Sequence, residues 1–184
     1  QIPEIEMDET LKTRLMNEAK FLRALYFFNL VRAFGDVPLP IGTSVEETIT
    51  ARIPLSEVYA QIISDLNDAK ALPKSYSGSN VGRATSGAAS VLLGYIYVTM
   101  KDWNAAVTEL SAVVNNESSF GYGLWDDLKD NYRIATENGK ECVFNVQFAE
   151  TPSNGNGDMA LSGPKYTLQA DYGIIAIPGI NGCN

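Results

Sequence analysis

Residues 18–40 read EAKFLRALYFFNLVRAFGDVPLP, and the fold follows from this stretch. The part from Glu18 to Phe34 predicts a helix, because good helix formers dominate it and no glycine or proline interrupts it. Its second half is apolar or aromatic on almost every side. Such a helix must be covered on several faces, and it is too short and too charged to span a bilayer. We therefore expect the central helix of a sizeable core.

Both ends of this helix are predicted by local signals. Gly35 stops it by allowing a left-handed C-cap, and the following prolines keep the chain extended. On the other side, leucines at helical spacing extend the pattern back to about residue 10, where Asp8 or Thr10 can serve as N-cap. The expected helix covers residues 10–34, after an extended lead-in at residues 1–7.

Three further helices follow along the chain. Residues 54–71 are amphipathic and start at Pro54, whose missing N–H costs nothing in the first helical turn. A loop rich in Ser, Gly and Asn separates them from a helix that ends near Met100 and is capped by Thr85 or Ser86. Asp102 then caps a helix from Trp103 to about Asn115.

The last two helices carry part of a tetratricopeptide (TPR) pattern. Leu93-Gly94 and Tyr97 lie at the offsets of the first helix of such a repeat, and Ala106 and Leu110 at those of the second. Small Gly94 and Ala106 allow two antiparallel helices to approach closely. Ser90 stands where the pattern has Trp. We expect two helical hairpins, of which the first is interrupted by a loop at residues 35–52.

The C-terminal third is predicted to be mixed. Apolar residues alternate with others over residues 142–148, and this period of two predicts a half-buried strand. Glycine, asparagine, serine and proline punctuate the chain after residue 150. Cys142 lies on the apolar face of the expected strand, which favours a buried free thiol. A disulfide between Cys142 and Cys183 remains the alternative.

The composition excludes several classes of function. The net charge of −8 argues against binding to nucleic acid, which needs clustered Lys and Arg, and against docking on anionic lipid. The sequence contains no histidine, so catalytic triads and histidine-based zinc sites are impossible. The two cysteines match no metal-binding spacing. We expect no catalytic residues, no metal site and no cofactor.

The stretch at residues 18–40 closely resembles the signature helix of the SusD/RagB family. The match covers the Glu18-Ala19-Lys20 entry, the Phe21-Leu22-Arg23-Ala24 core, an aromatic pair and the Phe34–Leu39 exit. The TPR-like hairpins agree with it. So does the order Asn138, Glu141 and hydrophobic strand, although Gly139-Lys140 lengthens that spacing by one residue.

This resemblance implies a function that the composition alone does not. SusD-like proteins are surface-exposed outer-membrane lipoproteins of Bacteroidetes that capture oligosaccharides and deliver them to a SusC-like TonB-dependent transporter. Members of the family are several hundred residues long. The resemblance therefore implies an internal portion of such a protein, without the lipidated Cys, the first helices and the C-terminal part.

Four residues in or next to the helical region are predicted to have structural roles. Arg23 and Arg32 need partners on an apolar helix, because an unpaired buried charge is costly. Asp36 follows Arg32 by four residues and is a natural ion-pair partner. Trp103 is expected to pack in the core, because Trp is highly buried on average.

Candidate ligand-binding residues gather in loop-like sequence after residue 118. An aromatic floor with a few polar groups is the usual arrangement for binding a sugar. The candidates are Tyr122, Trp125, Asp126, Asn131 and Tyr132. The alternative is that these aromatics only anchor the loop to the helices. Asp126-Asp127 is a weak candidate for an acid–base pair, because adjacent carboxylates need not converge.

These patterns together predict a single domain portion over residues 1–184. It is mainly α, with a TPR-like helical region at 10–117 and a mixed strand and loop region at 118–184. The preferred function is non-catalytic glycan binding. The alternative is a TPR-type scaffold that binds only protein.

Overall fold

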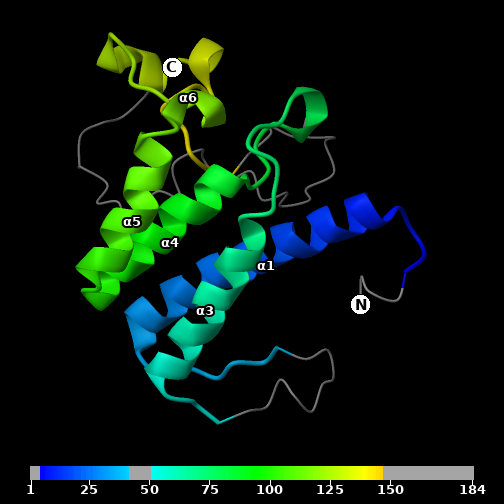
Figure 1. Ribbon diagram of the computed structural model, residues 1–184, viewed down its shortest axis with the longest axis vertical. Helices are drawn as coiled ribbons and strands as arrows, with labels where there is room; N and C mark the ends of the chain where they lie inside the picture. The colour runs from blue at the N-terminus through cyan, green and yellow to red at the C-terminus, as the bar shows by residue number, and fades with distance from the viewer. Residues whose placement is uncertain (1–4, 42–50, 147–184) are drawn as a thin grey trace, which may run out of the picture. The chain divides into compact units, whose positions relative to one another are not determined.

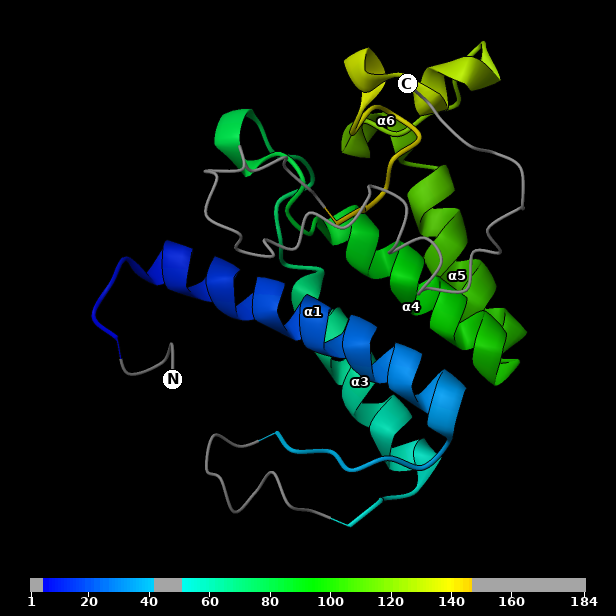
Figure 2. The same cartoon turned by 180° about the vertical axis from the view of Figure 1, so that it is seen from behind.

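The computed structural model describes residues 5–41 and 51–146, and within these ranges the chain is mainly helical. Figures 1 and 2 show the elements from opposite sides. The helices are α1 (Glu9–Phe34), α3 (Leu55–Ala69), α4 (Ser86–Met100), α5 (Trp103–Val114) and α6 (Glu117–Phe120). Short 3₁₀ turns follow at η2 (Gly78–Asn80), η3 (Leu128–Tyr132) and η4 (Ile134–Thr136). The predicted mainly α fold class and all four predicted helices are confirmed, the helices to within two residues at each end.

The predicted caps explain these boundaries. Asp8 Oδ1 accepts the Leu11 N–H at 2.8 Å at the start of α1. Thr85 and Asp102 accept N–H groups in the same way, each at 3.1 Å, at the starts of α4 and α5. Gly35 ends α1 with φ at 68° and ψ at −125°, which differs from the predicted left-handed cap but is still a conformation in which a side chain is strained.

The four long helices form two antiparallel pairs around one core. Helix α1 packs along α3, α4 packs along α5, and α3 contacts α4 to join the pairs (Figure 1). Buried side chains from three helices make the core: Phe21, Ala24, Phe28 and Val31 of α1, Val58, Ile62 and Leu66 of α3, and Ala89, Leu93 and Ile96 of α4. The two predicted hairpins are therefore present.

One side of α1 is not covered by the described residues. A row of apolar side chains, spaced one turn apart, is exposed: Leu22 by 40%, Tyr26 by 56%, Leu30 by 41% and Phe34 by 64%. We expected this apolar helix to be covered on several faces. The prediction is confirmed for the side that faces α3 and α4, but the described residues do not cover this row. None of the helices in the described ranges has the length and apolar character needed to cross a membrane.

The second pair confirms the close approach predicted from the TPR pattern. Gly94 lies so close to α5 that an added Cβ would be 2.5 Å from Leu110 Cδ2. Ala106 is 3% exposed and faces the same contact. The prediction for Trp103 is wrong, because this side chain is 59% exposed at the start of α5. Helix α5 covers α4 with one face only, and Trp103 lies on another.

The arginines of α1 have partners, though not the predicted one for Arg32. Arg23 makes two hydrogen bonds to Asp65 of α3, at 2.7 and 2.6 Å. Arg32 donates to Tyr95 Oη at 3.0 Å and lies over the Phe28 ring. The predicted Arg32–Asp36 pair is wrong, because the chain turns at Gly35 and Asp36 instead accepts the Leu55 N–H at 2.9 Å.

The predicted strand at 142–148 is not found in its described part. Residues 142–146 have no strand structure, and residues 147–148 lie outside the described residues. Phe144 still packs, and it meets Phe21 edge to face with ring centroids 4.9 Å apart. Its neighbour Val143 packs against the core as well, while Val146 is 48% exposed, so burial does not follow the predicted alternation. A strand also needs a hydrogen-bonding neighbour, and the described residues form only one isolated bridge, between Val37 and Ile53.

Candidate functional site

Glu141 brings two of the predicted ligand-binding residues together. Its Oε1 accepts the backbone N–H of Trp125, and its Oε2 accepts a hydrogen from Asn131 Nδ2. The hydrogen bond from Asn131, followed by that from Trp125, lowers the pKa of Glu141 below its ordinary value. A carboxylate in this position therefore fixes the loop from Trp125 to Asn131 onto the segment that precedes Cys142.

Trp125 is half-buried between two residues of the neighbouring turn. The Lys140 ammonium lies 4.8 Å from the centroid of its ring, within the range of a cation–π contact. Gly139 lies against the indole, where an added Cβ would be 2.5 Å from Trp125 Cζ2. Sequence reasoning missed both Lys140 and the role of Glu141. The extra residue in the spacing from Asn138 to Glu141 was the available signal.

Tyr122 points the other way, toward α4. Its hydroxyl is 3.2 Å from Thr85 Oγ1, and its ring stacks on Phe120 with centroids 5.7 Å apart. Gly87 makes room for it, because a Cβ there would be 2.6 Å from the Tyr122 hydroxyl. Burial raises the pKa of Tyr122. These contacts match the alternative in which this aromatic anchors the loop to the helices.

The remaining two candidates are open to solvent. Asp126 is exposed, and Tyr132 is 72% exposed at the end of η3. The structure therefore joins Trp125 and Asn131, turns Tyr122 toward the helices, and leaves Asp126 and Tyr132 on the surface. Their roles in ligand binding stay predictions.

A cleft of about 260 Å³ lies between the loop that follows α3 and the segment that follows α6. Its polar lining includes Lys74, Arg83 and Lys140, and its aromatic lining includes Tyr76, Phe120 and Tyr122. Of the five predicted residues, only Tyr122 lines it. Sequence reasoning did not find this cleft, because its two walls are separated by α4 and α5.

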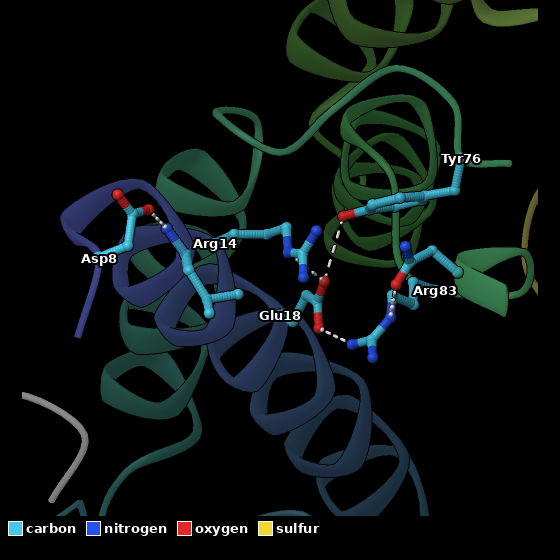
Figure 3. A network of polar contacts seen from close by, with 7 residues as sticks. Asp8, Arg14, Glu18, Tyr76 and Arg83 are labelled. Carbon is cyan, nitrogen blue, oxygen red and sulfur yellow. Dashed lines mark hydrogen bonds and ion pairs between the residues drawn. The ribbon is translucent and has the colours of Figure 1, made fainter. Parts of the chain in front are cut away.

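A polar network fixes one wall of the cleft to α1 (Figure 3). Glu18 Oε1 accepts the Tyr76 hydroxyl at 3.1 Å, and Glu18 Oε2 accepts Arg83 Nη1 at 2.7 Å. Arg14 Nε is 3.6 Å from the same carboxylate. Burial, and then the charge of Glu18, raise the pKa of Tyr76 to about 12. The loop is thus tied to the first residue of the signature stretch.

Cys142 and the acidic side chains are the potential metal ligands in the part of the chain that the structure describes. Within it, no three His, Cys, Asp or Glu side chains gather where they could hold a metal ion. Cys142 is a free, half-buried thiol, as the first of the two sequence interpretations predicts, and burial raises its pKa. Cys183 lies outside the described residues.

Comparison with known proteins points to one family. Residues 2–98 match the model of a SusD-like family described as starch-binding and associating with the outer membrane. The SusD-like protein P2 of Formosa agariphila is 30% identical over 189 residues, which cover 96% of this chain and 37% of that protein.

Solved structures agree with this match. A laminarin-binding SusD-like protein superposes with a TM-score of 0.72 at 34% identity, over 78% of this chain and 32% of its own. A structure determined with a xylogluco-oligosaccharide gives a TM-score of 0.67 at 26% identity, over 78% of this chain and 31% of its own. The chain thus spans about a third of the length of these relatives.

Proposed function

Because the chain belongs to the SusD-like family, we propose that the protein binds an oligosaccharide at a bacterial outer membrane and catalyses no reaction on it. The observation that carries this proposal is the likeness of the helical pairs to the laminarin-binding relative. In the same proposal, a lipid anchor holds the protein on the cell surface. It passes the sugar to a SusC-like TonB-dependent transporter.

We place sugar contacts at the loop that Glu141 organises. Tyr132 offers an exposed ring to the C–H face of a sugar. Trp125 precedes it on the same loop, where Glu141 holds its backbone N–H. Asp126 and Asn131 supply polar groups that can hydrogen-bond hydroxyls. Tyr122 supports this loop from the helix side.

Calorimetry and affinity electrophoresis against a panel of glycans test the proposal. We expect the chain to bind at least one glycan. The Trp125→Ala and Tyr132→Ala variants should each bind it about fivefold more weakly, since stacking on one ring is worth about 1 kcal/mol. Tyr26→Ala is the matched control, because Tyr26 is 56% exposed on α1 and outside this loop. Equal losses in all three variants would refute the assignment of the site, and no binding to any glycan would refute the function.

A protein-binding scaffold is the second candidate, and one surface favours it. An apolar groove of about 320 Å³ runs along α5 and the end of α4, lined by Val98, Trp103, Val107, Leu110 and Val114 among others. Exposed apolar surface of this kind commonly marks a protein contact. If no glycan binds while a transporter co-purifies with the protein, this second function replaces the first.

A further inference from the structure

The cleft between the loop after α3 and the segment after α6 has a charge opposite to that of the whole chain. The sequence contains 22 acidic and 14 basic residues. The residues that line this cleft nevertheless include Lys74, Arg83 and Lys140 and no Asp or Glu. A cationic cleft in an acidic protein concentrates anions locally.

Two of these three cations form no ion pair among the described residues, although the charge of Lys140 also acts on the neighbouring Glu141 carboxylate. Glu18 of α1 pairs with Arg83, so that side chain is already satisfied (Figure 3). Lys74 contacts the Ser119 hydroxyl at 3.2 Å and lies 5.4 Å from the centroid of the Phe120 ring. Lys140 lies over Trp125. Among the described residues, neither lysine forms an ion pair, so each ammonium can accept an anionic partner without breaking an existing pair.

The remainder of the lining suits a sugar ring. Tyr76, Phe120 and Tyr122 supply apolar and aromatic surface, while Thr85 and the Tyr122 hydroxyl supply uncharged polar groups. A volume of about 260 Å³ is enough for one or two sugar units rather than a long chain. Lys140 also connects the cleft to Trp125, which belongs to the loop proposed above for sugar stacking.

We propose that this cleft binds an anionic substituent of a sugar, a carboxylate or a sulfate ester, through Lys74 and Lys140, and so selects acidic over neutral glycans. The inference rests on the proposed function, because it names the class of glycan that the protein binds. Both substituents offer oxygen acceptors that make charge-assisted hydrogen bonds with an ammonium group.

The test compares three ligands of equal length by calorimetry: a neutral β-glucan oligosaccharide, an oligogalacturonate and a sulfated oligosaccharide. We expect at least one acidic ligand to bind about tenfold more tightly than the neutral one, and this preference to fall as salt is raised. The Lys74→Gln/Lys140→Gln double variant should reduce the acidic affinity to the neutral level. The acidic ligand that binds best identifies carboxylate or sulfate as the substituent.

The control double variant Arg52→Gln/Lys101→Asn removes the same total charge outside both the cleft and the loop from Trp125 to Asn131. Asparagine is chosen at position 101 because the backbone there has φ at 63°. If the control loses as much affinity as the cleft variant, or if the cleft variant keeps the acidic preference, the assignment is overturned. If the cleft variant does not fold, the ligand preference of the native protein and its salt dependence still test whether acidic glycans are selected. Binding of neutral glycan alone overturns this inference only, whereas no binding to any ligand overturns the proposed function as well.

Discussion

The two helical pairs differ in what lies between their helices. Between α1 and α3, the contact includes the ion pair of Arg23 with Asp65, whose side chain is buried and 1% exposed. Between α4 and α5, the contact is built on small residues, with Gly94 directly against Leu110. The first pair is therefore held by an interaction between specific charged side chains, and the second by the close packing of a small residue against a larger one.

This difference has consequences for how each pair tolerates substitution. A buried carboxylate is costly whenever its partner is removed. A close helix–helix contact is costly whenever volume is added. We therefore expect the first pair to be sensitive to deletion of a charge and the second to be sensitive to addition of a methyl group.

The largest effect is expected for Arg23→Met. The substitution keeps the apolar part of the side chain but leaves the Asp65 carboxylate buried, and Gln61, at 2.9 Å, is then its remaining donor among the described side chains. We expect the free energy of unfolding, measured by urea denaturation at pH 7, to fall by about 3 kcal/mol. The double variant Arg23→Met/Asp65→Leu should recover most of this loss, because no uncompensated charge remains.

A second ion pair between the same helices provides the control. Lys20 lies 2.7 Å from Asp68, but the Asp68 side chain is 51% exposed. Lys20→Met should therefore change the free energy of unfolding by less than about 1 kcal/mol. Similar losses for Arg23→Met and Lys20→Met would show that the burial of the carboxylate does not determine the cost of removing its partner.

The next largest effect is expected for Gly94→Val in the second pair. Its Cβ would lie 2.5 Å from Leu110 Cδ2 and 2.6 Å from Leu110 Cγ, so Leu110 or the helix must shift. We expect the free energy of unfolding to fall by about 2 kcal/mol. Gly94→Ala should cost less, because the higher helix propensity of alanine offsets about 1 kcal/mol.

A double-mutant cycle separates crowding from other causes. Leu110→Ala removes the atoms that the new Cβ would meet. If crowding is the cause, the Gly94→Val/Leu110→Ala variant should be more stable than the sum of the single losses predicts. Strict additivity would contradict the close-contact explanation.

The helix caps of the two pairs should give a smaller effect. Asp102→Ala removes the cap of α5 inside a tight hairpin, where the cap also fixes the turn at Lys101. We expect a loss of about 1 kcal/mol in the free energy of unfolding by thermal and urea denaturation. Asp8→Ala, at the solvent-exposed start of α1, should cost less, because that first turn can fray without disturbing the α1–α3 contact. Equal losses would contradict this distinction.

The sequence predicts well those features that depend on residues close together in the chain. Asp8, Thr85 and Asp102 cap the predicted helices because a cap needs only a residue three positions ahead. Likewise, the close contact of Gly94 with Leu110 follows from a repeat pattern that is confined to one hairpin. Both kinds of signal are local, and both predictions are confirmed.

Interactions between distant segments were not predicted. Asp65 is the partner of Arg23 at a separation of 42 residues, and Glu141 organises Trp125 at a separation of 16 residues. A single sequence gives no pairing signal at such distances. The same reason explains Trp103, whose exposure depends on what covers the outer face of α5 rather than on its own residue type. It also explains the missing strand at 142–146, because a strand needs a hydrogen-bonding neighbour that alternation in the sequence does not supply.

The last effect is absent at neutral pH and concerns the contact that links the loop after α3 to α1. Tyr76 lies in the loop from α3 to α4 and donates to Glu18 of α1; burial first, and then Glu18, raise its pKa from about 10 to about 12. The folded state therefore keeps this phenol protonated over a range in which the unfolded chain loses the proton. The stabilisation is fully present below pH 10 and is lost as the pH rises from about 10 to about 12.

Absorbance titration near 295 nm, taken as the difference between the native protein and Tyr76→Phe, measures this pKa directly. Glu18→Gln should shift it back toward 10, because the substitution removes the negative charge that opposes ionisation, while the part due to burial remains. Thr99→Ala is a suitable control, since Thr99 is exposed near the end of α4 and bonds only its own helix. If Glu18→Gln leaves the pKa of Tyr76 unchanged, the contact in Figure 3 does not hold the loop against α1 in solution. The two helical pairs would then be joined by the contacts of α4 with α3 and with α1, such as the hydrogen bond from Arg32 to Tyr95.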